Sequence, residues 1–188
     1  MNILILGGGG REHALAWAVK QNPKCDRLIV APGNAGIAQL AECADIDILS
    51  GATVVTFCEE NAIDFVIIGP EAPLAAGIVD DFRAHGLRIF GPTQAAAQLE
   101  SSKAFSKAFM QRHGIPTAEF ETFTDAALAH AYVDLKGAPI VVKADGLAAG
   151  KGVVVAMTLT EAHEAIDFML LDNTLGVAHN AGGARVVI

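Results

Sequence analysis

The sequence predicts an α/β fold in two parts, a parallel sheet covered by helices and then a mixed α+β unit. Short, continuously apolar runs alternate with helical patterns over the first hundred residues, which is typical of βαβ units. Further along, a long helical stretch leads to β-rich runs that flank a glycine-rich loop. A chain of 188 residues has room for an ordinary domain and a smaller one. We therefore place a domain boundary near residue 100.

In the first part, each apolar run is a predicted strand that ends at a turn signal. Continuously apolar strands with helices between them indicate a parallel sheet buried on both faces. Ser50 is the expected N-cap of one of the intervening helices. The predicted strands are 3–6, 27–31, 64–68 and 87–90, and the helical patterns follow the first strand, follow Ser50, and run through Leu74, Ile78 and Phe82.

The second part begins with a predicted helix over about 94–113, which a Gly-Ile-Pro sequence ends. Thr158 and Glu161 have the spacing of a capping box, so another helix is expected behind them. The predicted strands are 118–123, 140–144 and 153–156, the last two forming a hairpin, with a helix over Ala127 to Leu135 between the first and second. The sequence stops within an apolar run, and we expect it to be truncated at the C-terminus.

Composition limits the classes of function. A formal charge of -8 with only 13 Lys and Arg residues disfavours a nucleic-acid surface. Cys25, Cys43 and Cys58 are odd in number and lack metal-type spacing, which indicates reduced thiols in a cytoplasmic protein. No apolar run approaches the roughly 18 residues of a membrane helix, and the N-terminus lacks the basic region of a signal peptide. We expect neither a nucleic-acid nor a membrane partner.

Three loops follow predicted strands at the edge where parallel sheets bind ligands, namely 7–10, 32–36 and 69–71. Four glycines between a strand and a helix allow backbone N–H groups to approach a phosphate. A dinucleotide-binding oxidoreductase is a weaker alternative, because Glu12 replaces the third glycine of that fingerprint and no acidic residue ends the second strand. Each loop alone is also compatible with an ordinary turn or helix start.

The strongest single motif is the segment 141–153. Two β-rich runs flank three glycines and Lys151, while Lys143 ends the incoming strand. Mobile backbone donors and fixed cations suit the covering of a triphosphate. The segment is not a Walker loop, because Gly152 and a strand follow the lysine. The six histidines show no zinc-type pairing and no serine lies in a G-x-S-x-G motif, so a zinc site and an α/β-hydrolase are not supported.

Several ordered motifs together resemble the phosphoribosylamine–glycine ligase family, also called glycinamide ribonucleotide synthetases, which are ATP-grasp enzymes. The resemblance covers nearly the whole chain and rests on 7–14, 32–36, 69–74, 90–92, 99–110, 114–118 and 143–153. It implies a Rossmann-like, pre-ATP-grasp substrate domain over 1–100 and the first part of an ATP-grasp domain over 101–188. Within the latter, it implies a helical connector at about 101–116 and a lid subdomain at about 117–188.

The resemblance implies ligation of glycine to 5-phosphoribosylamine through a glycyl phosphate in de novo purine biosynthesis. The products are glycinamide ribonucleotide, ADP and phosphate, and the enzyme is expected to be a monomer. ATP and Mg²⁺ or Mn²⁺ are the implied cofactors, with the metal ligands expected beyond residue 188 and none within this chain. We therefore expect the 188-residue chain alone to be inactive. Another ATP-grasp carbon–nitrogen ligase and a non-catalytic nucleotide-binding fragment remain alternatives.

The resemblance also implies roles for individual residues, although it identifies no catalytic acid or base. The implied ATP-binding residues are Lys103, Lys143, Asp145, Gly146, Leu147, Ala148, Ala149, Gly150, Lys151 and Gly152. The implied phosphoribosylamine-binding residues are Gly8, Gly9 and Gly10 at the phosphate, Glu12, Asn34 and Glu71 nearer the ribose and amine, and Arg11, Gly36, Gly69 and Pro70.

Overall fold

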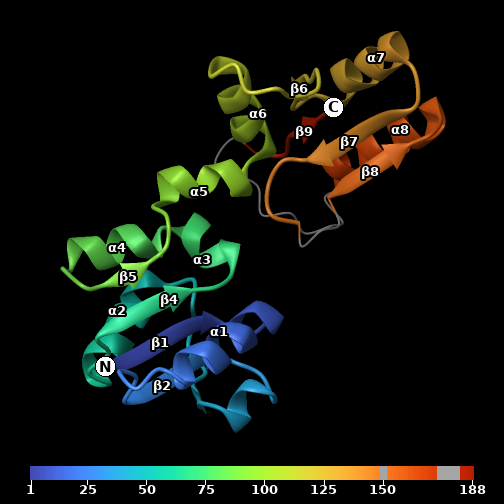
Figure 1. Cartoon of the computed structure of the whole chain (residues 1–188). Coiled ribbons are helices and arrows are strands. Elements are labelled where there is room, and N and C mark those ends of the chain that lie inside the picture. The colour runs from blue at the N-terminus through green and yellow to red at the C-terminus, as the bar shows by residue number, and fades with distance from the viewer. Residues whose placement is uncertain (149–151, 173–182) are drawn as a thin grey trace. The chain divides into compact units, whose positions relative to one another are not determined.

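The computed structural model describes residues 1–148, 152–172 and 183–188 (Figure 1). The chain divides into two compact units, Met1–Ala97 and Gln98–Ile188. Each unit has its own sheet.

The first unit is built on a parallel sheet, as the sequence predicts (Figure 1). The sheet has five strands, because the short β3 joins the four that were expected. Its strand order is β3-β2-β1-β4-β5, so β1 lies between β2 and β4. The carboxyl ends of these three strands are therefore neighbours at one edge. The strands are β1 (Asn2–Gly7), β2 (Arg27–Pro32), β3 (Glu42–Cys43), β4 (Phe65–Ile68) and β5 (Ile89–Phe90).

Both faces of this sheet are buried. Leu4 and Leu6 pack in one core with α2 and α4, whereas Ile5 packs in another with α1 and the 3₁₀ helix η1. Alternate residues of a strand point to opposite faces, so β1 contributes to both cores. The helices are α1 (Gly10–Lys20), η1 (Ile37–Gln39), α2 (Gly51–Glu60), α3 (Glu71–Ala76) and α4 (Ile78–Ala84), and α5 (Gln94–Ser101) leads into the second unit.

Two helices expected to be continuous are each divided in two. Gly77, with φ of +95°, separates α3 from α4. Ser102 separates α5 from α6 (Lys103–Arg112), and its Oγ accepts a hydrogen bond from the N–H of Phe105 at 3.1 Å. A left-handed glycine ends a helix and a serine N-cap begins one, which explains both breaks.

The second unit contains a four-stranded antiparallel sheet with the order β6-β9-β7-β8. The predicted hairpin is confirmed, with Lys143 paired to Val153 across it. The strand expected over 118–123 is shorter than predicted and covers only its last two residues. The strands are β6 (Thr122–Phe123), β7 (Ile140–Ala144), β8 (Val153–Ala156) and β9 (Val186–Val187), and the remaining helices are α7 (Ala126–Lys136), α8 (Leu159–Asp167) and the π-helical turn η2 (Phe168–Asp172).

One face of this second sheet packs on α7 and α8 (Figure 1). Val142, Ala144 and Ala156 are completely buried there. Lys143 and Val153 occupy alternate positions and therefore point to the opposite face. That opposite face is open, since Val153 and Val155 are 46% and 61% exposed.

Side chains cap the helices largely as expected. Ser50 Oγ accepts from the N–H of Thr53 at 3.2 Å, which confirms the predicted cap of α2. Thr158 Oγ1 likewise accepts from Glu161 at 3.2 Å, but Glu161 Oε2 bonds to the N–H of Met157 instead of that of Thr158. The second hydrogen bond of this capping box therefore goes to the residue that precedes the N-cap.

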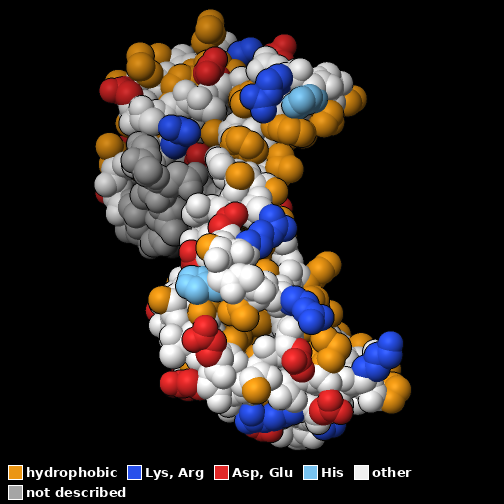
Figure 2. Space-filling model, turned by 90° about the vertical axis from the view of Figure 1, so that its left-hand side faces the viewer, with side chains coloured by type: hydrophobic (Ala, Val, Ile, Leu, Met, Phe, Trp, Pro, Cys, Tyr) orange, Lys and Arg blue, Asp and Glu red, His pale blue; other side chains and the backbone are white. Residues whose placement is uncertain are grey.

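The described residues include no helix that is long and apolar enough to cross a membrane. On the face shown in Figure 2, lysine and arginine side chains lie apart from one another among acidic ones.

Candidate functional site

The three predicted loops of the first unit meet at the carboxyl edge of its sheet. Asn34 Nδ2 donates to the carbonyl oxygen of Gly8 at 2.8 Å, which joins the loops after β1 and β2. Arg11 donates through Nη1 to the carbonyl oxygen of Gly69 and through Nη2 to Glu71 Oε1 at 2.9 Å. The structure therefore brings residues from all three loops together, and α1 links the first loop to the third.

The first of these loops has the geometry of an anion site. A Cβ on Gly8 would lie 2.5 Å from the carbonyl oxygen of Gly33, so only glycine fits there. Gly9 is the N-cap of α1, which leaves the backbone N–H groups of Gly10 and Arg11 without partners in the helix. Unpaired donors at the positive end of a helix attract phosphate.

Glu12 lies inside the junction of the loops and is only 4% exposed. Its Oε2 accepts a hydrogen bond from the N–H of Gly9 at 2.6 Å. A Cβ on Gly7 or Gly69 would lie 2.6 Å or 2.1 Å from atoms of this side chain. Glu12 therefore supports the backbone of these loops. Its carboxylate also accepts from the Gly9 N–H, a donor that was expected to face a phosphate.

Asn34 also supports the backbone. Its Oδ1 accepts from the N–H groups of Gly36 and Ile37 at 2.8 and 2.9 Å, while its Nδ2 bonds to Gly8. Gly36 is required for space, because a Cβ there would lie 2.7 Å from His13 Cε1. His13 is therefore an additional side chain of this site, absent from the predicted set although it belongs to the motif 7–14.

Glu71 is the accessible carboxylate of this group, with 41% of its side chain exposed. Its pKa lies below the ordinary value because its own backbone N–H and then the Arg11 guanidinium bond to it. Pro70 immediately precedes it as the N-cap of α3. A carboxylate that remains charged and partly open can accept from hydroxyl or ammonium groups of a ligand.

The second unit has cavities on the open face of its sheet. One of about 500 Å³ is lined by Leu99, Glu100, Lys103, Ser106, Lys107, Met110, Lys143, Val153 and Val187. The other, of about 370 Å³, shares Lys107, Lys143 and Val187 with the first. Helix α6 and strand β7 thus bring three lysines from distant positions to one place.

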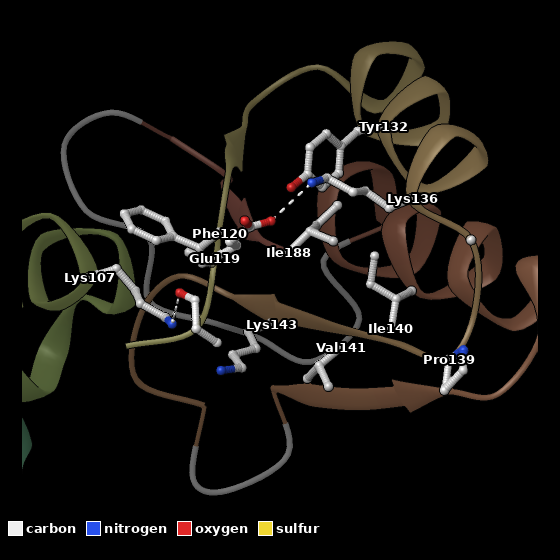
Figure 3. A pocket seen from close by; sticks show the side chains of 13 residues that line it. Lys107, Glu119, Phe120, Tyr132, Lys136, Pro139, Ile140, Val141, Lys143 and Ile188 are labelled. Carbon is white, nitrogen blue, oxygen red and sulfur yellow. Dashed lines mark hydrogen bonds and ion pairs between the residues drawn. The ribbon is translucent and has the colours of Figure 1, made fainter. Parts of the chain in front are cut away.

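Figure 3 shows that the smaller cavity has a largely apolar wall. Phe120, Val141 and Ile188 contribute to this wall. Lys107 and Lys143 lie toward one end, and Lys136, which pairs with Glu119 at 3.2 Å, lies toward the other. An apolar wall beside cations suits a ligand with a flat aromatic part and an anionic part.

The lysine amines differ in their environments. Lys103 Nζ donates to the carbonyl oxygen of Gly146 at 3.1 Å, and its pKa is lowered chiefly by burial. Lys107 Nζ donates to Thr117 Oγ1 at 2.7 Å, and burial and the nearby Lys143 lower its pKa. Lys107 was not among the predicted site residues. Lys107 follows Lys103 by four positions on α6, so both side chains lie on the same face of the helix. This spacing is the sequence signal that could have identified Lys107.

The described part of the glycine-rich loop begins with a buried carboxylate. Asp145 is 3% exposed and bonds to the start of α6, as described below. Gly146 has φ of +132°, and a Cβ on Gly152 would lie 2.7 Å from that of Ala148. Leu147 and Ala148 are partly buried. Ala149, Gly150 and Lys151 lie outside the described residues.

The residues that the structure describes include no group of three or more His, Cys, Asp or Glu side chains that could hold a metal ion. The resemblance implies that the ligands of Mg²⁺ or Mn²⁺ lie beyond residue 188.

A Rossmann-like sheet followed by a lysine-bearing antiparallel sheet with a glycine-rich hairpin is the arrangement of the ATP-grasp class of proteins. Two family models match the chain: Phosphoribosylglycinamide synthetase, N domain, over residues 1–100, and Phosphoribosylglycinamide synthetase, ATP-grasp (A) domain, over residues 101–188. The chain belongs to the phosphoribosylglycinamide synthetase family.

Similar proteins agree with this family. Phosphoribosylamine–glycine ligases from Ralstonia nicotianae and Neisseria meningitidis serogroup B are 64% and 63% identical over all 188 residues. The crystal structure of phosphoribosylamine–glycine ligase from Thermotoga maritima matches with a TM-score of 0.74 and 29% identity, covering 100% of this chain and 43% of that one. The chain spans 44% of the length of the first two relatives.

More distant structures share the fold. A carboxyaminoimidazole ribonucleotide synthase from Aspergillus clavatus, solved with ATP, matches with a TM-score of 0.73 at 17% identity, covering 99% of this chain and 46% of that one.

Proposed function

We propose that this chain provides the phosphoribosylamine site and part of the ATP site of a phosphoribosylamine–glycine ligase. The observation that carries the proposal is the convergence of Lys103 and Lys143 on one cavity beside the glycine-rich hairpin. These lysines come from a helix and a strand forty positions apart, so their meeting is a product of the fold. The family and the names of its relatives support this reaction.

In the proposed reaction, a carboxylate oxygen of glycine attacks the γ-phosphorus of ATP, and ADP leaves. The amine of phosphoribosylamine then attacks the carbonyl carbon of glycyl phosphate, which forms the amide and releases phosphate and a proton. Lys103 and Lys143 neutralise phosphate charge that increases during transfer. The apolar wall at Val141 accommodates the purine base.

The loops of the first unit bind phosphoribosylamine in this proposal. The N–H groups of Gly10 and Arg11 receive its 5-phosphate at the start of α1. Glu71 accepts from the ribose hydroxyls or the amine, since its charged carboxylate is partly exposed. Glu12 and Asn34 maintain the shape of the site through backbone contacts. We accordingly assign residues 1–100 to the substrate domain and residues 101–188 to the beginning of the ATP-grasp domain.

The test is a comparison of Lys103→Ala and Lys143→Ala in the full-length protein, with Lys20→Ala as the control. Lys20 is exposed at the end of α1 and lines neither cavity. Each cavity variant should raise the KM for ATP or lower kcat at least tenfold, because charged hydrogen bonds contribute about 1.5–3 kcal/mol. Unchanged ATP kinetics in both variants, with the fold intact by circular dichroism, would refute the assignment of this cavity.

A complementary variant tests the first unit. Glu71→Ala should raise the KM for phosphoribosylamine and leave the KM for ATP unchanged. The opposite pattern would show that the loops of the first unit do not bind this substrate.

A further inference from the structure

We propose that Asp145 is a positioning residue that holds Lys103 and Gly146 in one arrangement, without contacting the nucleotide itself. The inference rests on the proposed function of the same cavity. It gives Asp145 a different role from the ATP contact that the sequence indicates.

The first step is the contact of Asp145 with the beginning of α6. Its Oδ1 accepts from the N–H of Ala104 and from Ser102 Oγ, both at 3.1 Å, and Ser102 Oγ lies 3.3 Å from Oδ2. Lys103 lies between these two partners in the chain. One carboxylate therefore holds the residues on both sides of Lys103, Ser102 through its hydroxyl and Ala104 through its backbone N–H. Its negative charge suits the N-terminus of a helix.

The second step is the contact of Lys103 with the loop. Lys103 Nζ donates to the carbonyl oxygen of Gly146, the residue that follows Asp145, at 3.1 Å. Asp145 and Lys103 thus connect the same two segments twice, once through the helix backbone and once through the lysine side chain. Together these two connections restrict the positions that the Lys103 ammonium can occupy.

The third step is the connection to β9. The N–H of Asp145 donates to the carbonyl oxygen of Arg185 at 2.8 Å, and Arg185 Nη1 lies 3.7 Å from Asp145 Oδ2. Asp145 and Ser102 are 3% and 4% exposed, so water has little access to this junction. Because the carboxylate oxygens are directed to Ser102, Ala104 and Arg185, the carboxylate is already occupied by protein groups.

The fourth step concerns the charge of Lys103. Burial lowers the pKa of its ammonium, whereas the charge of Asp145 raises it; Lys143 lowers it further and Glu100 raises it. Removing the charge of Asp145 should lower the pKa of Lys103 further. The amine should then lose its proton at a lower pH. The site would thereby lose the positive charge that faces the phosphate.

The experiment compares Asp145→Asn, Asp145→Ala and Ser102→Ala in the full-length protein. Asn keeps an acceptor for the Ala104 N–H but has no charge, whereas the Ser102 variant loses one contact and keeps the charge. Asp134→Asn is the control, because Asp134 is half exposed and bonds to His163 on α8. The measurements are the KM and kcat for ATP and the pH profile of Lys103 acetylation by acetic anhydride, followed by peptide mass spectrometry.

Asp145→Asn should move the Lys103 acetylation profile to lower pH, and Asp145→Ala should also raise the KM for ATP about tenfold. Ser102→Ala should raise this KM less and leave the acetylation profile in place. A folded Asp145→Asn protein with an unmoved profile would overturn the inference, as would an unchanged KM for ATP in folded Asp145→Ala. If Asp145→Ala does not fold, the Asn variant alone decides.

These outcomes are distinct from a failure of the proposed function. The acetylation profile reports on Lys103 without ATP turnover. If Lys103→Ala and Lys143→Ala leave ATP kinetics unchanged, the cavity assignment fails, whatever the acetylation profile of Asp145→Asn shows.

Discussion

Lys107 Nζ lies 2.7 Å from Thr117 Oγ1, so one ammonium connects helix α6 to the segment that leads into β6. The same amine donates to the carbonyl oxygen of Ala118 at 3.1 Å and lies 5.4 Å from the centroid of the Phe120 ring. Lys107, Ala118 and Phe120 belong to one wall of the cavity in Figure 3. Lys107 therefore shapes the cavity while adding positive charge to it.

Lys107→Met should weaken ATP use by loosening this wall. We expect the KM for ATP to rise roughly five- to thirtyfold, since one charge-assisted contact contributes about 1–2 kcal/mol in partly exposed surroundings. Thr117→Val keeps the shape of the side chain and removes one acceptor, so its effect should be smaller. Steady-state kinetics of the full-length protein measures both. A larger effect of Thr117→Val than of Lys107→Met would contradict this role.

Gly8→Ala and Gly10→Ala form a matched pair within one loop. A Cβ on Gly8 meets the backbone oxygen of Gly33 at 2.5 Å, whereas one on Gly10 meets nothing within 4 Å. Gly8→Ala should therefore destabilise the protein by about 2 kcal/mol or more through forced backbone movement. Gly10→Ala, at the first position of α1, should be neutral or stabilising by up to about 1 kcal/mol.

Chemical denaturation of the two glycine variants measures this difference. Gly8→Ala should also raise the KM for phosphoribosylamine, while Gly10→Ala keeps the N–H that the phosphate is proposed to use. Equal losses of stability in the two variants would show that the contact with the Gly33 oxygen does not determine the effect of Gly8→Ala.

Asn34→Ala removes three hydrogen bonds at once, to Gly8, Gly36 and Ile37. We expect a loss of about 2–3 kcal/mol in the free energy of unfolding, because each such bond contributes about 1 kcal/mol. Asn22→Ala is the control, since Asn22 Oδ1 has a single exposed contact with the N–H of Lys24 at 3.0 Å. Urea denaturation compares them. Similar losses in both would mean that the bonds of Asn34 add little.

The sequence patterns predicted the parallel sheet and the hairpin because each has a local signature of apolar period, turn residues or glycine spacing. Lys103 and Lys143 were indicated by the family resemblance, and the cavity that they share with Lys107 had no local signature. The inward position of Glu12 has no such signature. It depends on the approach of Gly7 and Gly69, which belong to loops after different strands, and on the space that glycine leaves there. Glu12 is the third residue of α1 and accepts from the N–H of the N-cap Gly9, as a capping acid does, but this position alone does not show that the side chain is buried.

Other differences also have physical causes. Strand β3 and helix η1 are only two and three residues long, too short to show a period. The breaks at Gly77 and Ser102 interrupt continuous helical patterns, so apolar spacing alone hides them. Glycine commonly ends helices and serine commonly begins them, so residue identity is the signal that the apolar spacing lacked at both positions.

The three cysteines should differ in reactivity. Cys58 is 2% exposed, and burial raises the pKa of its thiol to about 12, whereas Cys43 is exposed. The thiolate is the reactive form, and a raised pKa makes it scarce at any pH below that value. At pH 8, iodoacetamide should therefore label Cys43 and leave Cys58 unmodified in the folded protein. In denaturant Cys58 should become reactive, and mass spectrometry of peptides reads both states. Labelling of Cys58 as fast as Cys43 under native conditions would contradict the burial of its side chain between α2 and the sheet.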